Sequence, residues 1–63
     1  MIPHVFTEYV DIESGKKVLD QLQMESPNKI SIKFIAKQPA ETVKTLSEYA
    51  KLLWPIDGQL TIL

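Results

Sequence analysis

The side chains that could do chemistry are few, and no catalytic motif joins them. The chain has no cysteine and a single histidine, His4, so it lacks the usual ligands of a zinc or thiolate metal site. A Ser/His/Asp triad would have to be built on His4 and Asp57. Neither Ser14 nor Ser47 lies in the strand-turn-helix sequence that exposes a serine nucleophile. We therefore expect no enzymatic activity, no metal and no cofactor.

Acidic pairs and isolated glycines supply no stronger site. Glu8 and Asp20 could face each other on neighbouring strands, but two carboxylates without further ligands bind a hard cation weakly. Gly15 and Gly58 stand alone, so the chain has no phosphate-binding loop. A ligand cavity of ~300 Å³ is also difficult to enclose in so short a chain that must form a core. We expect no small-molecule substrate.

The charge balance disfavours nucleic acid as the main partner. Seven basic and eight acidic residues give a net charge of -1, and the chain has no arginine. Binding to phosphates therefore lacks its usual electrostatic driving force and its best bidentate side chain. Lys29, Lys33 and Lys37 do share one face of a predicted strand, and Tyr9 could stack on a base. Weak binding of single-stranded nucleic acid is the second alternative function.

Length sets further limits on the architecture. The 63 residues predict a single domain, residues 1–63, and a chain of this size buries only about 60% of the surface that its unfolded form exposes. No apolar segment approaches the ~20 residues of a membrane-spanning helix, and no basic region followed by an apolar run begins the chain. We expect a cytoplasmic protein with no membrane contact. Without disulfides, its stability must come from tight packing or from association with another chain.

The second half of the chain has the clearest periodicity. Residues 29–37 alternate between apolar and polar side chains with one exception, which is typical of a half-buried strand. Residues 39–54 predict a helix that ends at Pro55. An apolar stripe recurs along it at helical spacing: Val43, Leu46, Ala50, Leu53 and Trp54. Residues 57–58, Asp-Gly, then predict a turn into a final strand over residues 59–63.

The first half of the chain fits two topologies. Residues 4–12 are rich in β-branched and aromatic side chains and predict a strand. Residues 13–15, Glu-Ser-Gly, match a three-residue hairpin loop, which makes residues 16–24 a second strand. The same residues 16–24 are also good helix formers. The hairpin, which we prefer, gives an α+β fold of about four strands with one helix packed on one face (β-β-β-α-β). The helix gives the alternative order β-α-β-α-β.

A single helix covers only one face of such a sheet, so the other face is available to a partner. On the hairpin register that face carries Val5, Tyr9, Leu19, Lys33, Ile35, Thr61 and Leu63. Ile35 is the most informative member, because it interrupts an otherwise polar row. Leu52 is a separate candidate that points away from the apolar stripe of the helix. The predicted partner-binding residues are Tyr9, Leu19, Lys33, Ile35 and Leu52.

Size and composition, and no family motif, suggest the class of function. A small, mildly acidic chain without cysteine suits phage-encoded inhibitors of host proteins, antitoxins and immunity proteins. We expect a non-enzymatic protein-binding module, an inhibitor or adaptor that occludes the surface of a partner protein. The alternative is a homodimer or assembly subunit that buries the same sheet face for stability.

Overall fold

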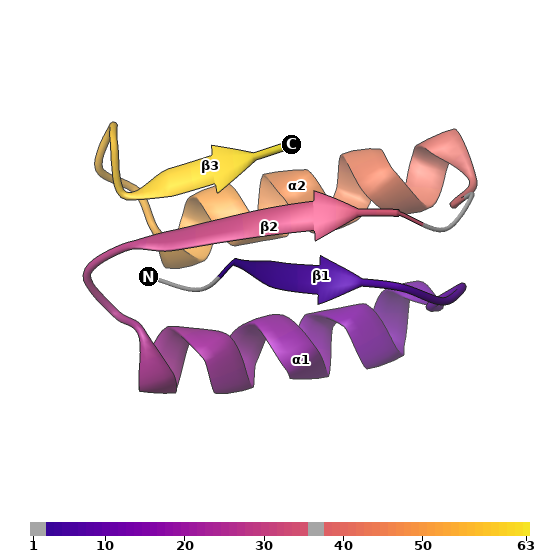
Figure 1. The fold of residues 1–63 in the computed structure, drawn as a ribbon, viewed down its shortest axis with the longest axis horizontal. Helices are drawn as coiled ribbons and strands as arrows, with labels where there is room; N and C mark the ends of the chain where they lie inside the picture. The colour runs from indigo at the N-terminus through magenta and orange to yellow at the C-terminus, as the bar shows by residue number, and fades with distance from the viewer. Residues whose placement is uncertain (1–2, 36–37) are drawn as a thin grey trace.

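The computed structural model describes residues 3–35 and 38–63 and has α+β architecture. Three strands alternate with two helices (Figure 1). The elements are β1 (His4–Phe6), α1 (Ile12–Glu25), β2 (Ile30–Phe34), α2 (Ala40–Leu53) and β3 (Leu60–Ile62). The α+β class is thus confirmed, and the observed order is the β-α-β-α-β alternative. The preferred arrangement of four strands and one helix is wrong.

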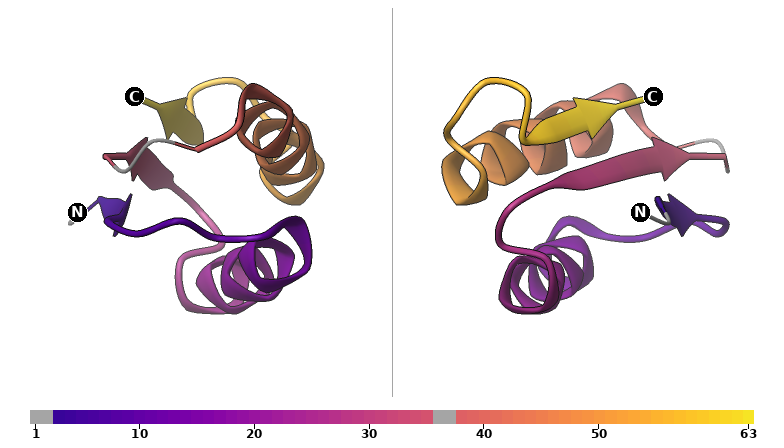
Figure 2. Two further views of the ribbon diagram at one scale, coloured as in Figure 1. Left: turned by 90° about the vertical axis from the view of Figure 1, so that its right-hand side faces the viewer. Right: turned by 60° about the vertical axis from the view of Figure 1, so that its left-hand side comes forward.

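All the strands of the described sheet are parallel, in the order β1-β2-β3. β1 pairs with β2 in the register His4↔Ile32, and β2 pairs with β3 in the register Ile30↔Leu60. Parallel neighbours need crossover connections, and the two helices provide them. Figure 2 shows both helices on the same side of the sheet. The molecule therefore has two layers, and no described element covers the second face of the sheet.

Helix α1 replaces the expected hairpin. It begins at Ile12 because the Asp11 side chain accepts a hydrogen bond from the backbone N–H of Ser14 at 2.7 Å and so caps the first turn. Gly15 is no turn residue but is buried inside the helix, where Leu46 of α2 packs against it. The missing side chain lets the two helices approach closely. This long-range contact explains why the local sequence suggested a turn.

The elements of the second half are confirmed. β2 lies within the predicted strand 29–37, α2 within residues 39–54 and β3 within residues 59–63. Gly58 has a φ of 87°, a left-handed conformation that suits glycine in the turn before β3. Positions 36 and 37 of the predicted strand lie outside the described residues.

The core lies between the sheet and the two helices. Its buried members are Phe6, Leu19, Ile30, Ile32, Leu46, Ala50 and Trp54. Trp54, which is 2% exposed, donates a hydrogen bond from Nε1 to the carbonyl oxygen of Ser26 at 2.9 Å. This bond ties the end of α2 to the C-cap of α1. It also supplies the indole N–H with the partner that a buried tryptophan requires. None of the described helices has the length and apolar character needed to cross a membrane.

Candidate protein-binding surface

The uncovered face of the sheet is built by every second residue of the strands. Ile30, Ile32 and their paired neighbours point to the helices, so the residues between them point the opposite way. We call this surface the open face. Its residues are Val5, Ser31, Lys33, Ile35, Thr61 and Leu63. Its location on the side away from both helices can be followed in Figure 2.

Two large apolar side chains lie on the open face just past the ends of their strands. Ile35 is 61% exposed and Leu63 is 65% exposed. The backbone fixes both positions. The N–H of Ile35 donates to the carbonyl oxygen of Phe6 at 3.0 Å, and the N–H of Leu63 donates to the carbonyl oxygen of Ile32 at 2.9 Å. These backbone hydrogen bonds continue the pairing with the neighbouring strands. The exposure of both side chains therefore follows from the register of the sheet.

Lys33 is the charged residue in the middle of the open face. It pairs in register with Val5 of β1 and is exposed. Since Ile32 pairs with Ile62, the next residue along β3, Leu63, lies level with Lys33 on its other side. On the open face, Lys33 of the central strand thus lies between two apolar residues, Val5 on the side of β1 and Leu63 on the side of β3. Such a surface can bury aliphatic groups and pair with one acidic group of a binding partner.

Tyr9 lies in the loop between β1 and α1 and not on a strand. Its side chain is 64% exposed. The loop is held by Gln38, whose amide nitrogen donates to the carbonyl oxygen of Glu8 at 2.7 Å and whose amide oxygen accepts from the N–H of Val10 at 3.2 Å. The backbones of Glu8 and Val10, on either side of Tyr9, are therefore both held by hydrogen bonds to Gln38. It shares the carboxyl end of the sheet with Ile35.

Two further predicted site residues lie away from the open face. The expected position of Leu19 is wrong: it is in α1, is 1% exposed and belongs to the core, because residues 16–24 form a helix and not a strand. Leu52 is in α2 and is 76% exposed, so it does project to solvent as expected. It stands on the helix layer, which is the other side of the molecule from Ile35.

The expected carboxylate pair does not form. Asp20 lies in α1, where its Oδ1 accepts a hydrogen bond from the Tyr49 hydroxyl at 2.5 Å, and Glu8 lies in the β1–α1 loop. This hydrogen bond raises the pKa of Tyr49, because ionisation would place two negative charges side by side. Lys16 lies over the Tyr49 ring with its Nζ 5.3 Å from the ring centre. Among the described residues, no three His, Asp or Glu side chains lie close enough to hold a metal.

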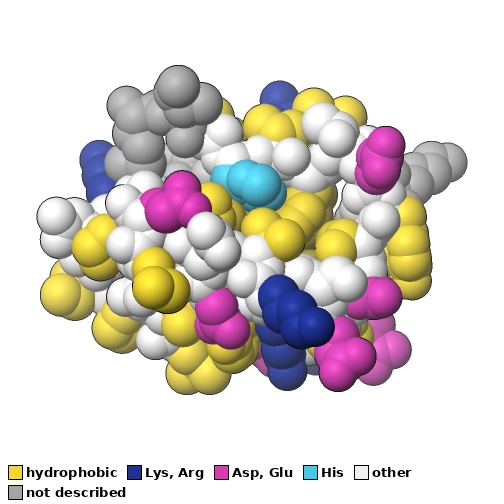
Figure 3. Space-filling model, turned by 90° about the horizontal axis from the view of Figure 1, so that it is seen from below, with side chains coloured by type: hydrophobic (Ala, Val, Ile, Leu, Met, Phe, Trp, Pro, Cys, Tyr) yellow, Lys and Arg dark blue, Asp and Glu magenta, His cyan; other side chains and the backbone are white. Residues whose placement is uncertain are grey.

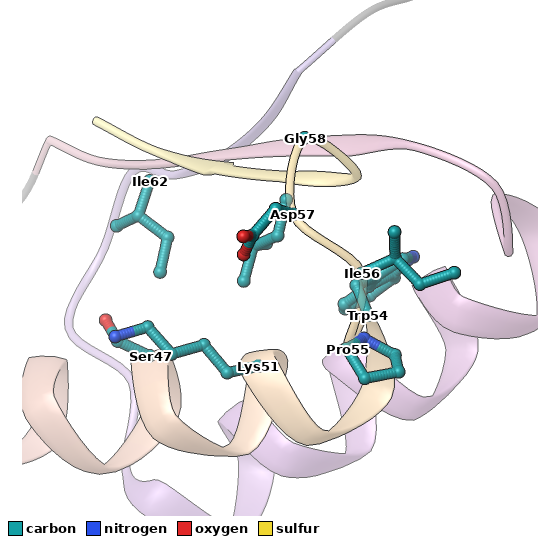
Figure 4. Close-up of a pocket in the computed structure, with 9 residues that line it drawn as sticks. Ser47, Lys51, Trp54, Pro55, Ile56, Asp57, Gly58 and Ile62 are labelled. Atoms are coloured by element: carbon teal, nitrogen blue, oxygen red, sulfur yellow. The ribbon is translucent and has the colours of Figure 1, made fainter.

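Among the described residues, a groove lies along each edge of the sheet. The groove between α1 and β1 has a volume of about 450 Å³ and includes His4, Val18 and Leu22. Figure 3 shows the histidine in a hollow bordered by hydrophobic side chains. The groove between α2 and β3 has a volume of about 520 Å³ and is shown in Figure 4. Neither groove could be predicted from the sequence, because both depend on the order of the strands.

Comparison with known proteins identifies no relative. No family model, no curated protein and no solved structure matches the chain.

Proposed function

We propose that this protein is a non-enzymatic, cytoplasmic protein-binding module, an inhibitor or adaptor, whose open face covers part of the surface of a partner protein. The observation that carries the proposal is a parallel sheet with both described helices on one side and with Ile35 and Leu63 exposed on the other. Parallel sheets occur almost always with both faces covered. A partner surface would provide the second cover.

The residues of the open face suit this purpose. Burying a side chain such as Ile35 or Leu63 contributes about 1.5–3 kcal/mol when it passes fully from water to an apolar contact. Tyr9 lies close to the carboxyl end of the same sheet, and tyrosine is among the residues that most often anchor interfaces. Lys33 would then favour a partner with an acidic group at the matching position.

The experiment compares two substitutions of the same kind at different places. Ile35→Lys puts a charge on the open face, and Met24→Lys puts the same charge on α1, where Met24 is 82% exposed. Both side chains are solvent-exposed, so both variants are expected to fold. Immobilised wild-type protein and Met24→Lys should retain the same partner from an extract of the native cells. Ile35→Lys should lose it.

Self-association through the same face is the competing function. It would satisfy the need for a second cover without any other protein. In that case Ile35→Lys would convert a dimer into a monomer or unfold the chain, and its melting would depend on concentration. Retention of a distinct partner by the wild-type protein, together with an Ile35→Lys variant that has the same mass in solution as the wild type, would exclude this alternative.

A further inference from the structure

Within the described residues, β3 is an edge strand with no strand paired on the side away from β2. In a parallel pair, the residues that bond to the neighbour alternate with residues whose N–H and C=O point away. The carbonyl oxygen of Gln59 accepts from Ile30 at 2.8 Å, and the N–H of Leu63 donates to Ile32 at 2.9 Å. The backbone groups of Leu60 and Ile62 therefore point outward. They give two donors and two acceptors in a row at the edge of the sheet.

β3 is short, at three residues, but its sequence lacks the side chains that normally protect edge strands. Charged side chains and proline on an edge discourage pairing with another chain. Residues 60–63, Leu-Thr-Ile-Leu, contain neither. The opposite edge of the sheet differs, because Pro3 directly precedes β1 and has no N–H to donate. Of the two edges, the β3 edge is therefore the more suitable for pairing with a further strand.

A groove with both polar and apolar lining runs beside the same edge. It lies between α2 and β3, and its apolar lining includes Trp54, Ile56 and the half-buried Leu60 and Ile62. Figure 4 shows the Ile62 side chain pointing from β3 toward α2. Ile56 is 64% exposed. A strand added to β3 would set its own side chains over this groove. Backbone hydrogen bonds and apolar contacts would then act together.

We infer that the occupant of this edge is a second copy of the chain, bound antiparallel to β3 about a two-fold axis through Thr61. In this register Leu60 of each copy faces Ile62 of the other. Their outward N–H and C=O groups make four hydrogen bonds across the interface. Four half-buried aliphatic side chains then meet on the helix side of the sheet. The two Thr61 side chains meet on the open-face side, a favourable cross-strand pair.

Charge favours the same arrangement. Figure 4 shows Lys51 extending along α2 toward Ser47, beneath Ile62, whereas Asp57 lies in the turn that leads into β3. Antiparallel pairing brings Asp57 of one copy toward the end of the groove that holds Lys51 of the other. Each dimer would gain this contact twice by symmetry. The net charge of -1 on each copy opposes association only weakly.

The dimer goes beyond the proposed function and uses a different surface. It joins two sheets into one of six strands and leaves the open faces of both copies uncovered, side by side. A binding module of this kind would present two identical surfaces to its partner. The proposed function and the edge dimer therefore depend on different residues, and either can be refuted without affecting the other.

The test places a proline at Ile62, whose N–H points away from β2. Ile62→Pro removes an N–H that makes no bond within the monomer, and Ile62→Ala removes most of the same side chain while keeping the N–H. We expect the mass of the wild-type protein in sedimentation to rise from 7.2 kDa toward twice that value between about 10 µM and about 1 mM. Ile62→Pro should raise the dissociation constant at least about tenfold above that of Ile62→Ala. Circular dichroism checks that both variants are folded.

A charge swap at the symmetry axis gives an independent test. Thr61→Lys and Thr61→Glu each place like charges opposite one another in the dimer, so each variant alone should be monomeric. An equimolar mixture of the two should dimerise again. The inference is overturned if the wild-type mass stays at 7.2 kDa throughout the concentration series. It is equally overturned if Ile35→Lys, and not Ile62→Pro, abolishes the dimer, since that would place the contact on the open face.

Discussion

Gly15 offers the sharpest test of how the two helices pack. A Cβ added at this position would lie 2.6 Å from Cδ1 and 2.7 Å from Cδ2 of Leu46. Leu46 is 1% exposed and has little room to move. Alanine is favoured over glycine inside a helix by about 1 kcal/mol, whereas overpacking a core costs about 1–3 kcal/mol. Because two carbons are this close, we expect the upper part of that range. Gly15→Ala should lower the free energy of unfolding by about 1–2 kcal/mol.

The sign of the effect should reverse when Leu46 is shortened. Leu46→Ala removes both δ-carbons and by itself should cost about 2–5 kcal/mol. In that background Gly15→Ala meets no obstacle, so helix propensity should stabilise the protein by about 1 kcal/mol. Urea unfolding followed by the fluorescence of Trp54 measures all four proteins. A constant concentration of sucrose keeps the weakest variant folded at the start of the titration. The expected coupling energy between the two positions is about 2–3 kcal/mol.

The outcome that refutes this packing is additivity. If Gly15→Ala stabilises the wild-type protein and the Leu46→Ala variant by the same amount, then Leu46 does not lie against the backbone of α1. The parallel arrangement of the helices over the sheet would then need revision.

Two further changes test the ends of the helices. Trp54→Phe leaves the carbonyl oxygen of Ser26 without its indole donor, so we expect a loss of about 1–3 kcal/mol in urea unfolding followed by circular dichroism; an unchanged midpoint would contradict the hydrogen bond. The Ser14 N–H lowers the pKa of Asp11 below its ordinary value of 3.8, so the stabilisation by this carboxylate is present above pH 3.8 and is lost as the pH falls through the lowered value. Asp11→Ala should therefore be less stable than the wild type at neutral pH, and the difference should close in strong acid; a constant difference would refute the cap.

The sequence correctly predicted β2 and α2, whose hydrophobic periodicity matches the face that each buries in the fold. Alternation located β2, and an apolar stripe of period 3.6 located α2, because each pattern reports a single buried face. The sequence predicted a hairpin in place of α1 because Gly15 suggested a turn. The glycine is instead required by the close contact with Leu46, which lies 31 positions further along the chain, and no local pattern indicates such a contact. Asp11 before Ile12, with Glu13 in the first turn, was the signal that indicated a helix start.

The candidate surface was predictable only in part. Lys33 and Ile35 follow from the alternation of β2 in either topology, so both were placed on an uncovered face. Leu19 was misplaced because its position depended on the hairpin register. The free edge of β3 could not be foreseen, since strand order is set by the crossover connections and not by any property of residues 60–63.

The most direct test of the central claim compares partner capture by three proteins: wild type, Ile35→Lys and Met24→Lys. Each is immobilised at the same density and exposed to the same extract at physiological salt. If the open face is the binding surface, one protein is retained by the wild type and by Met24→Lys and is absent from Ile35→Lys. Equal retention by all three, or retention by none, would contradict the proposal that this face covers a partner.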